Sequence, residues 1–169
     1  STPNNFILLA NNNLITCNFD ATKLKAQSNR IYNTTYLNSD SQLISGKINR
    51  IIDVNKIPSP YLNGYLDEFF DLPLIPMIET SRGCPFTCSF CTDGLSIKNR
   101  VTRYDEQRTK EELQYIAKKV KKTDELIITD LNFAMYKQDI KTAEHIADIQ
   151  KDFNYPTIVS ASAGKNLPE

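Results

Sequence analysis

The second half of the chain alternates between strand and helix patterns, and this alternation limits the folds that it can adopt. Residues 74–80 form an apolar run typical of a buried strand. The following segments have, in turn, the patterns of a helix, a strand, a helix and a strand: 109–120, 125–129, 137–153 and 156–161. Such an order favours parallel strands joined by helical crossovers, so we expect an α/β fold.

Apolar residues recur at helical spacing in three segments, which predicts which side chains face the core. One helix is expected over 60–70, after an N-cap at Ser59. A capping-box pattern at Thr109 and Glu112 predicts the start of the next. Its inward face is Leu113, Ile116, Ala117 and Val120. The inward face of the last helix is Ile140, Ala143, Ile146, Ala147 and Ile149.

The N-terminal region has a different character from the rest of the chain. Two short β-prone runs, 6–10 and 14–18, flank an Asn-rich turn and predict a hairpin. The stretch that follows is polar, and we expect irregular structure or short strands there. We therefore divide the chain into residues 1–56, a hairpin and linker region, and residues 57–169, which hold the strand and helix pattern.

Composition narrows the environment and the partners. Among 169 residues, lysine and arginine together number 20, and aspartate and glutamate together also number 20. The chain therefore has no overall basic field that would favour binding to nucleic acid or to an anionic membrane surface. No apolar run approaches the roughly 20 residues that span a bilayer, and the N-terminus lacks a signal-peptide pattern. We expect a cytoplasmic protein with no membrane partner.

Three cysteines, Cys84, Cys88 and Cys91, follow the first predicted strand of the alternating region. In α/β folds, active sites form at the carboxyl ends of the strands. Three thiolates from one loop can hold three irons of a [4Fe–4S] cluster and leave the fourth free for a small molecule. The alternative is a structural zinc site, which needs a fourth ligand such as Cys17 or His145.

The spacing of these cysteines, with Phe90 just before the third, resembles the signature of the radical S-adenosylmethionine (radical SAM) superfamily. Residues 57–70 and the run from Glu79 to Cys84 are most similar to the branch with an N-terminal cobalamin-binding domain. The resemblance implies a partial, TIM-like (β/α) barrel of the radical SAM type. Because a closed eightfold barrel needs about 250 residues, we expect a truncated barrel and a fragment of a longer protein.

The resemblance also implies a chemistry and a set of contacts. S-adenosylmethionine would bind the free iron and be cleaved by one electron to a 5′-deoxyadenosyl radical, with a flavodoxin or ferredoxin as electron donor. Contacts with this cosubstrate would come from the following residues: Phe90 along the adenine, Asp130 and Asn132 at the methionyl amine, and Ser162 and Lys165 at polar oxygens. Each of these residues also has an ordinary alternative. Phe90 could pack beneath the loop, Asp130 and Asn132 could form a turn or a helix cap, and Ser162 and Lys165 could be solvated loop residues.

The predicted function is therefore a radical SAM enzyme acting on an unidentified substrate. Methyl transfer or rearrangement is typical of the cobalamin branch, and a sister possibility is methylthio transfer. Residues 1–56 contain no histidine, so cobalamin is expected only in the full-length protein. The alternative from another class is a non-enzymatic zinc-binding or interaction module.

Overall fold

The computed structural model divides the chain into two compact units, Ser1–Asp53 and Val54–Glu169. Their boundary lies near the predicted one between residues 56 and 57. The residues that the structure describes are 8–10, 13–15, 35–37, 40–48, 51–96 and 99–164.

The first unit contains two antiparallel strand pairs. β1 (Leu8–Ala10) pairs with β2 (Asn13–Ile15), so the predicted N-terminal hairpin is confirmed with shorter strands. β3 (Thr35–Leu37) pairs with β4 (Leu43–Ser45), which agrees with the short strands expected after the hairpin.

The second unit is built around a three-stranded parallel sheet with the order β5-β8-β9. Its strands are β5 (Met77–Ile78), β8 (Glu125–Phe133) and β9 (Ile158–Ala163). Helix α2 (Glu106–Lys119) precedes β8, and helix α3 (Lys137–Phe153) precedes β9. The predicted α/β fold with parallel strands is thus confirmed. Among the described residues the parallel sheet has three strands, so the partial barrel remains a prediction.

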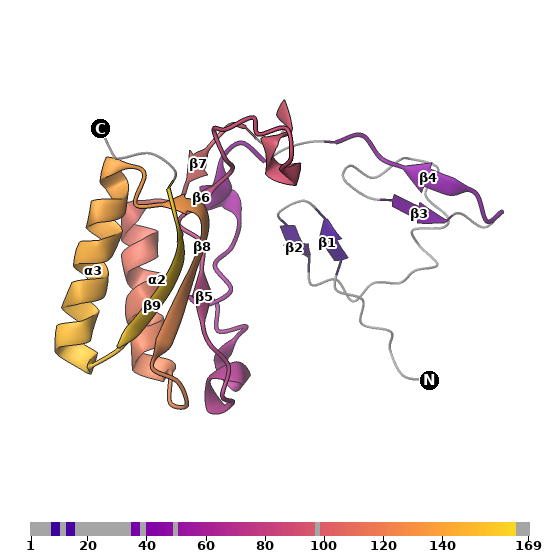
Figure 1. Cartoon of the computed structure of the whole chain (residues 1–169). Coiled ribbons are helices and arrows are strands. Elements are labelled where there is room, and N and C mark those ends of the chain that lie inside the picture. Colours follow the sequence, from indigo (N-terminus) through magenta and orange to yellow (C-terminus); the bar gives the residue numbers. More distant parts are fainter. Residues whose placement is uncertain are drawn as a thin grey trace, which may run out of the picture. The chain divides into compact units, whose positions relative to one another are not determined.

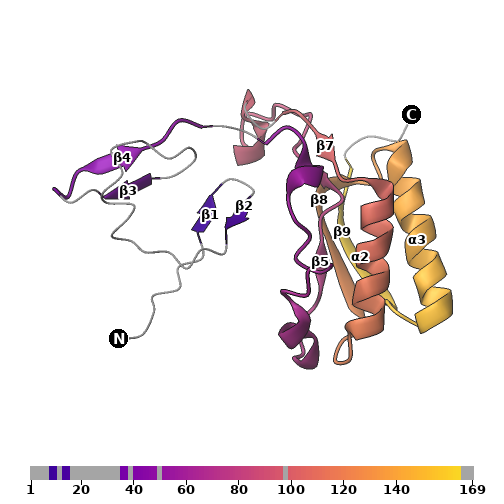
Figure 2. The ribbon, with the colours of Figure 1, turned by 180° about the vertical axis from the view of Figure 1, so that it is seen from behind.

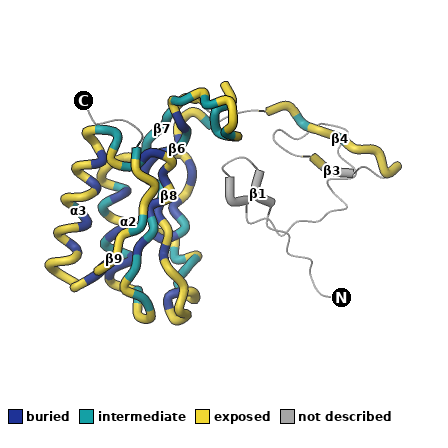
Figure 3. The backbone as a smooth tube through the Cα atoms, in the orientation of Figure 1, coloured by how far each residue is buried: buried dark blue, intermediate teal, exposed yellow. Residues whose placement is uncertain are grey.

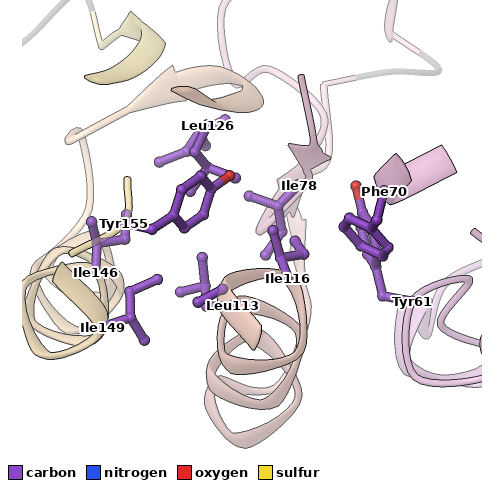
Figure 4. Close-up of a cluster of buried hydrophobic side chains, with 11 residues drawn as sticks. Tyr61, Phe70, Ile78, Leu113, Ile116, Leu126, Ile146, Ile149 and Tyr155 are labelled. Atoms are coloured by element: carbon purple, nitrogen blue, oxygen red, sulfur yellow. The ribbon is translucent and has the colours of Figure 1, made fainter. Parts of the chain in front are cut away.

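Both helices lie side by side on one face of this sheet (Figures 1 and 2). The buried hydrophobic core fills the space between them and the strands (Figure 4). Its members are Tyr61, Phe70, Ile78, Leu113, Ile116, Ala117, Leu126, Ile128, Ile146, Ile149 and Tyr155. Within the described part of the chain, no helix combines the length and the apolar character needed to cross a bilayer.

Helix α2 begins earlier than the sequence predicts. The capping-box prediction put the N-terminus at Thr109, whereas the helix starts at Glu106 after Asp105. The Thr109 N–H donates to the Asp105 carbonyl at 3.0 Å, so Thr109 lies within the first turn and is buried. The predicted inward face is confirmed, since Leu113, Ile116 and Ala117 are buried and Val120 packs against the core.

Helix α3 has the predicted ends, but part of its predicted face is wrong. Ile146 and Ile149 are in the core, whereas Ile140 is 57% exposed and the two alanines are also exposed. The buried positions are Asp139, Thr142, Ile146 and Ile149. The buried face of α3 is therefore rotated away from Ile140 toward Ile146 and Ile149.

The predicted helix over 60–70 is wrong as a regular α-helix. The segment forms turns followed by a 3-10 helix, η2 (Asp67–Asp71). Gly64 has a φ of +70°, which a right-handed helix cannot accommodate. The N-cap interaction itself is present, because the Ser59 hydroxyl accepts the Leu62 N–H at 3.1 Å.

The apolar residues of that segment divide between the core and the surface. Tyr61 and Phe70 are buried. The Tyr61 hydroxyl donates to the Met77 carbonyl at 2.7 Å and accepts the Met77 N–H at 3.0 Å, so it ties the segment to β5. Three neighbours remain exposed: Leu62, Tyr65 and Phe69.

The strand bounds also differ from the predictions. β5 has two residues, and the chain then enters β6 (Ser81–Arg82), which pairs antiparallel with β7 (Thr102–Arg103). β8 continues four residues beyond the predicted end at Thr129, with a register irregularity relative to β9 between Ile128 and Phe133. β9 lies largely on the surface, as the exposed colouring in Figure 3 shows.

Candidate functional site

The cysteines lie in the loop between β6 and β7, residues 83–101, which we call the cysteine loop. Gly83, its first residue, has a φ of +108°, a conformation that favours glycine and turns the chain away from β6. Cys84 is buried, and Cys88 and Cys91 are half-buried. The prediction that the cysteines follow the first strand of the sheet is thus confirmed.

The middle of the cysteine loop is compact. The Cys91 N–H donates to the Cys88 carbonyl at 3.1 Å, and the Gly94 N–H donates to the Cys91 carbonyl at 3.1 Å. A Cβ added at Gly94 would lie 2.5 Å from the Cys88 carbonyl oxygen. Only glycine fits there, so Gly94 shapes the backbone that carries two of the thiols. The role of Gly94 could not be predicted, because a close backbone approach leaves no pattern in the sequence.

The three thiols are not arranged to hold a metal ion together in this structure. Within the described ranges, no group of three His, Cys, Asp or Glu side chains has such an arrangement. The predicted coordination by Cys84, Cys88 and Cys91 therefore stays a prediction.

Both ends of the cysteine loop are anchored by charged side chains. Before the loop, Arg82 Nε donates to both carboxylate oxygens of Glu79 at 3.0 Å. Burial alone would lower the pKa of Arg82, but the hydrogen bonds and charge of Glu79 raise it. After the loop, Arg103 pairs at 2.9 Å with Asp139, which is buried on α3. These pairs hold the two ends of the loop at β6 and β7.

Tyr104 adjoins the first of these pairs. Its hydroxyl accepts from Arg82 Nη2 at 3.1 Å and donates to Glu79 Oε2 at 3.3 Å. Burial, the largest effect, raises the pKa of Tyr104 to about 12. The phenol therefore stays neutral and polarised between the two charges at physiological pH.

Polar residues replace apolar ones toward the carboxyl end of β8. Leu126 and Ile128 are buried in the core, and Asp130 and Asn132 continue the same alternation of buried positions. A strand usually buries apolar side chains on its core-facing side, so two fully buried polar residues in succession require partners. Both find them in or just before the cysteine loop.

Asp130 holds the segment that enters the cysteine loop. Its carboxylate accepts the Thr80 backbone N–H at 2.7 Å, the Thr80 hydroxyl at 2.5 Å and the Ser81 hydroxyl at 2.7 Å. Asp130 is only 1% exposed. The resemblance to the radical SAM superfamily predicts a contact between Asp130 and the cosubstrate and no role for Thr80 or Ser81. These hydrogen bonds give Asp130 a structural role, and its contact with the cosubstrate stays a prediction.

Asn132 reaches the first cysteine. Its side-chain Nδ2 donates to the Cys84 sulfur at 3.2 Å, and both residues are 4% exposed. Its Oδ1 is buried and has no hydrogen-bond partner among the described residues. The amide thus contacts the cysteine loop through its donor and leaves its acceptor free.

The remaining predicted contacts have different surroundings. Phe90 is 88% exposed, so packing beneath the loop, the alternative for this residue, is wrong. Ser162 is exposed on β9, and Lys165 lies outside the described residues. His145, the candidate fourth zinc ligand, sits on α3 with its Nε2 3.2 Å from Glu106 on α2. The other candidate, Cys17, lies outside the described residues.

The chain has relatives among known enzymes. It is 30% identical over 115 residues to 2-(S-pantetheinyl)-carbapenam-3-carboxylate methyltransferase of Streptantibioticus cattleyicolor, covering 64% of this chain and 17% of that protein. It is 29% identical over 126 residues to the cobalamin-dependent radical SAM methyltransferase TokK of Streptomyces tokunonensis, covering 71% of this chain and 18% of TokK. The chain is thus similar in sequence to two methyltransferases, one of which, TokK, is a cobalamin-dependent radical SAM enzyme. No protein-family model matches it.

A solved structure shares the fold. The cobalamin-dependent S-adenosylmethionine radical enzyme OxsB, determined with aqua-cobalamin and S-adenosylmethionine bound, aligns with a TM-score of 0.51 and 20% identity. The alignment covers 78% of this chain and 18% of OxsB. The similarity in sequence to TokK confirms the predicted resemblance to the cobalamin branch of the radical SAM superfamily, and OxsB shows a shared fold. The chain spans less than a fifth of the length of these relatives.

Proposed function

We propose that this chain forms part of a cobalamin-dependent radical SAM methyltransferase. In this proposal Cys84, Cys88 and Cys91 ligate three irons of a [4Fe–4S] cluster, and S-adenosylmethionine binds the fourth. One observation carries the proposal: three cysteines share a loop that follows the first strand of the parallel sheet, in a chain similar in sequence to such an enzyme.

The residues present suit these groups chemically. Thiolates are soft ligands, which favour iron–sulfur clusters over cations that prefer oxygen ligands. The unpaired, buried Oδ1 of Asn132 suits a hydrogen-bond donor from a ligand, because an unsatisfied buried acceptor costs about 1–3 kcal/mol. The ammonium group of S-adenosylmethionine is a donor of this kind.

Ligation would draw the three thiols together. Ligand side chains commonly gather only when the metal binds, and the binding free energy offsets the ordering of the loop. The positive φ of Gly83 and the close approach at Gly94 give the backbone of the cysteine loop a tight curvature around its centre. The anchored ends at Arg82 and Arg103 limit this rearrangement to the loop itself.

The chemistry that such a cluster supplies is one electron to S-adenosylmethionine, which then yields methionine and a 5′-deoxyadenosyl radical. The chain itself would bind and orient the cosubstrate. Phe90 presents an exposed ring suited to stacking on adenine. Asn132 offers an acceptor to the amine, and Asp130, two positions earlier on β8, is also proposed there. Ser162 and Lys165 are proposed for ribose or carboxylate oxygens.

Two further components enter the proposal through the relatives. Cobalamin is proposed for the whole protein, because TokK and OxsB are cobalamin-dependent enzymes. The single histidine of this chain, His145, pairs with Glu106, and we assign it no cobalamin ligation. A flavodoxin or ferredoxin is proposed as the electron donor.

Anaerobic reconstitution with iron and sulfide tests the proposal. We expect a brown protein with the iron and sulfide content of one [4Fe–4S] cluster, which Cys84→Ala loses. Cys17→Ala is the matched control, since it removes a cysteine outside the loop, and it should retain the cluster. A colourless protein that binds zinc, and loses it on Cys17→Ala, would instead indicate the zinc module.

A further inference from the structure

The contact between Asn132 and Cys84 joins two buried groups from distant parts of the chain. Asn132 is the last buried position of β8, and Cys84 is the first cysteine of the loop. Their hydrogen bond of 3.2 Å crosses 48 residues of sequence. In a buried environment the effective dielectric constant is low, so a hydrogen bond to a charged sulfur is stronger than in water.

The orientation of the amide matches an anionic sulfur. An asparagine side chain offers two N–H donors and one carbonyl acceptor, and a metal-ligating cysteine is a thiolate, which can only accept. Asn132 turns Nδ2 toward Cys84 and leaves Oδ1 without a partner among the described residues. The amide donor thus faces the sulfur although the amide acceptor stays unsatisfied, which is the arrangement that a thiolate requires.

We propose that Asn132 sets the reduction potential of the cluster by donating a hydrogen bond to the Cys84 thiolate. This inference rests on the proposed function and assigns Asn132 a role toward the protein's own ligand, in addition to any contact with the cosubstrate. Hydrogen bonds to the sulfurs are one of the factors that fix the potential of an iron–sulfur cluster.

The direction of the effect follows from charge. One-electron reduction adds a negative charge to the cluster and its thiolates, and an N–H dipole pointing at a sulfur stabilises the reduced form more than the oxidised form. The hydrogen bond therefore raises the potential. Removing it should lower the ratio of reduced to oxidised cluster at a fixed potential by on the order of tenfold, a shift of about 59 mV for one electron.

Three variants separate this tuning role from a structural one. Asn132→Leu removes the donor with a similar volume, and Asn132→Asp removes it and adds a negative charge. Asn63→Leu is the matched control, because Asn63 Nδ2 also donates a hydrogen bond, but to the Ser59 carbonyl at 2.7 Å and not to a cysteine sulfur. A structural defect would lower the cluster content, whereas loss of tuning would change the potential of an intact cluster.

The experiment is a redox titration of the reconstituted full chain, in which electron paramagnetic resonance measures the fraction of reduced cluster at each potential. We expect equal iron and sulfide content throughout and potentials in the order wild type, Asn132→Leu, Asn132→Asp, with the last the most negative. Asn63→Leu should match the wild type. An unchanged or raised potential in Asn132→Leu overturns the inference, and so does loss of the cluster from both Asn132 variants. Failure of the wild type to form any cluster would instead contradict the proposed function.

Discussion

Replacing Asp130 with alanine should destabilise the fold at the base of the cysteine loop. The carboxylate accepts three hydrogen bonds, from the Thr80 N–H, the Thr80 hydroxyl and the Ser81 hydroxyl, at 2.5–2.7 Å. All three donors and the acceptor are buried. Alanine would leave the donors facing a small apolar side chain.

The magnitude follows from these contacts. A buried donor without a partner costs about 1–3 kcal/mol. The Thr80 N–H is fixed by the backbone and suffers this loss in full, whereas the two hydroxyl groups can rotate toward other acceptors and lose less. We expect a loss of about 3–5 kcal/mol in the free energy of unfolding, out of roughly 5–15 kcal/mol for a typical domain. Asp130→Asn keeps the shape and should lose less.

Urea unfolding, monitored by far-ultraviolet circular dichroism, measures this change in the free energy of unfolding. Asp130→Ala should lower the midpoint without a change in the slope. Asp152→Ala, at an exposed position of α3, is the matched control and should stay within about 0.5 kcal/mol of the wild type. If Asp130→Ala unfolded at the same urea concentration as this control, the three hydrogen bonds would contribute nothing and the structural role of Asp130 would be refuted.

Three further predictions concern the cysteine loop and its surroundings. Gly94→Ala would press a methyl group against Cys88 and should reduce iron incorporation, whereas Gly164→Ala, with a comparable clash elsewhere, should retain iron; equal losses would contradict this role. Burial raises the pKa of Tyr104 from 10.0 to about 12, so the neutral phenol contributes stability that is fully present below pH 10 and is lost as the pH rises to about 12. Between these pH values the free energy of unfolding should therefore fall less for Tyr104→Phe than for the wild type. An equal fall in both proteins would contradict this prediction. Phe90→Ala should leave the free energy of unfolding within about 0.5 kcal/mol of the wild type and weaken S-adenosylmethionine binding to the reconstituted chain; unchanged binding would exclude the adenine contact.

The order of strands and helices could be predicted because the periodic segments are long. The seventeen residues of α3 begin and end where the pattern predicts, and Asn154 in the left-handed conformation ends the helix. Period alone could not choose the buried face, since apolar residues such as Ile140 lie around much of the circumference. The segment over 60–70 was mispredicted because its helical spacing outweighed one glycine, Gly64, whose positive φ interrupts the helix.

The candidate site could be predicted only in part. The resemblance to the radical SAM superfamily assigned Cys84, Asp130 and Asn132 to one site, and the structure brings these three together with Thr80 and Ser81. Their partners could not be predicted, because each contact joins residues about fifty positions apart and depends on how β5, β6 and β8 align.

The central claim is that three thiolates hold a cluster whose fourth iron is open to a ligand. Electron paramagnetic resonance of the reduced, reconstituted chain, recorded with and without S-adenosylmethionine, tests this claim most directly. We predict a [4Fe–4S] signal whose shape changes when S-adenosylmethionine is added, because the cosubstrate binds the iron that lacks a cysteine ligand. A cluster signal that S-adenosylmethionine leaves unchanged, or the absence of any cluster signal, would contradict it.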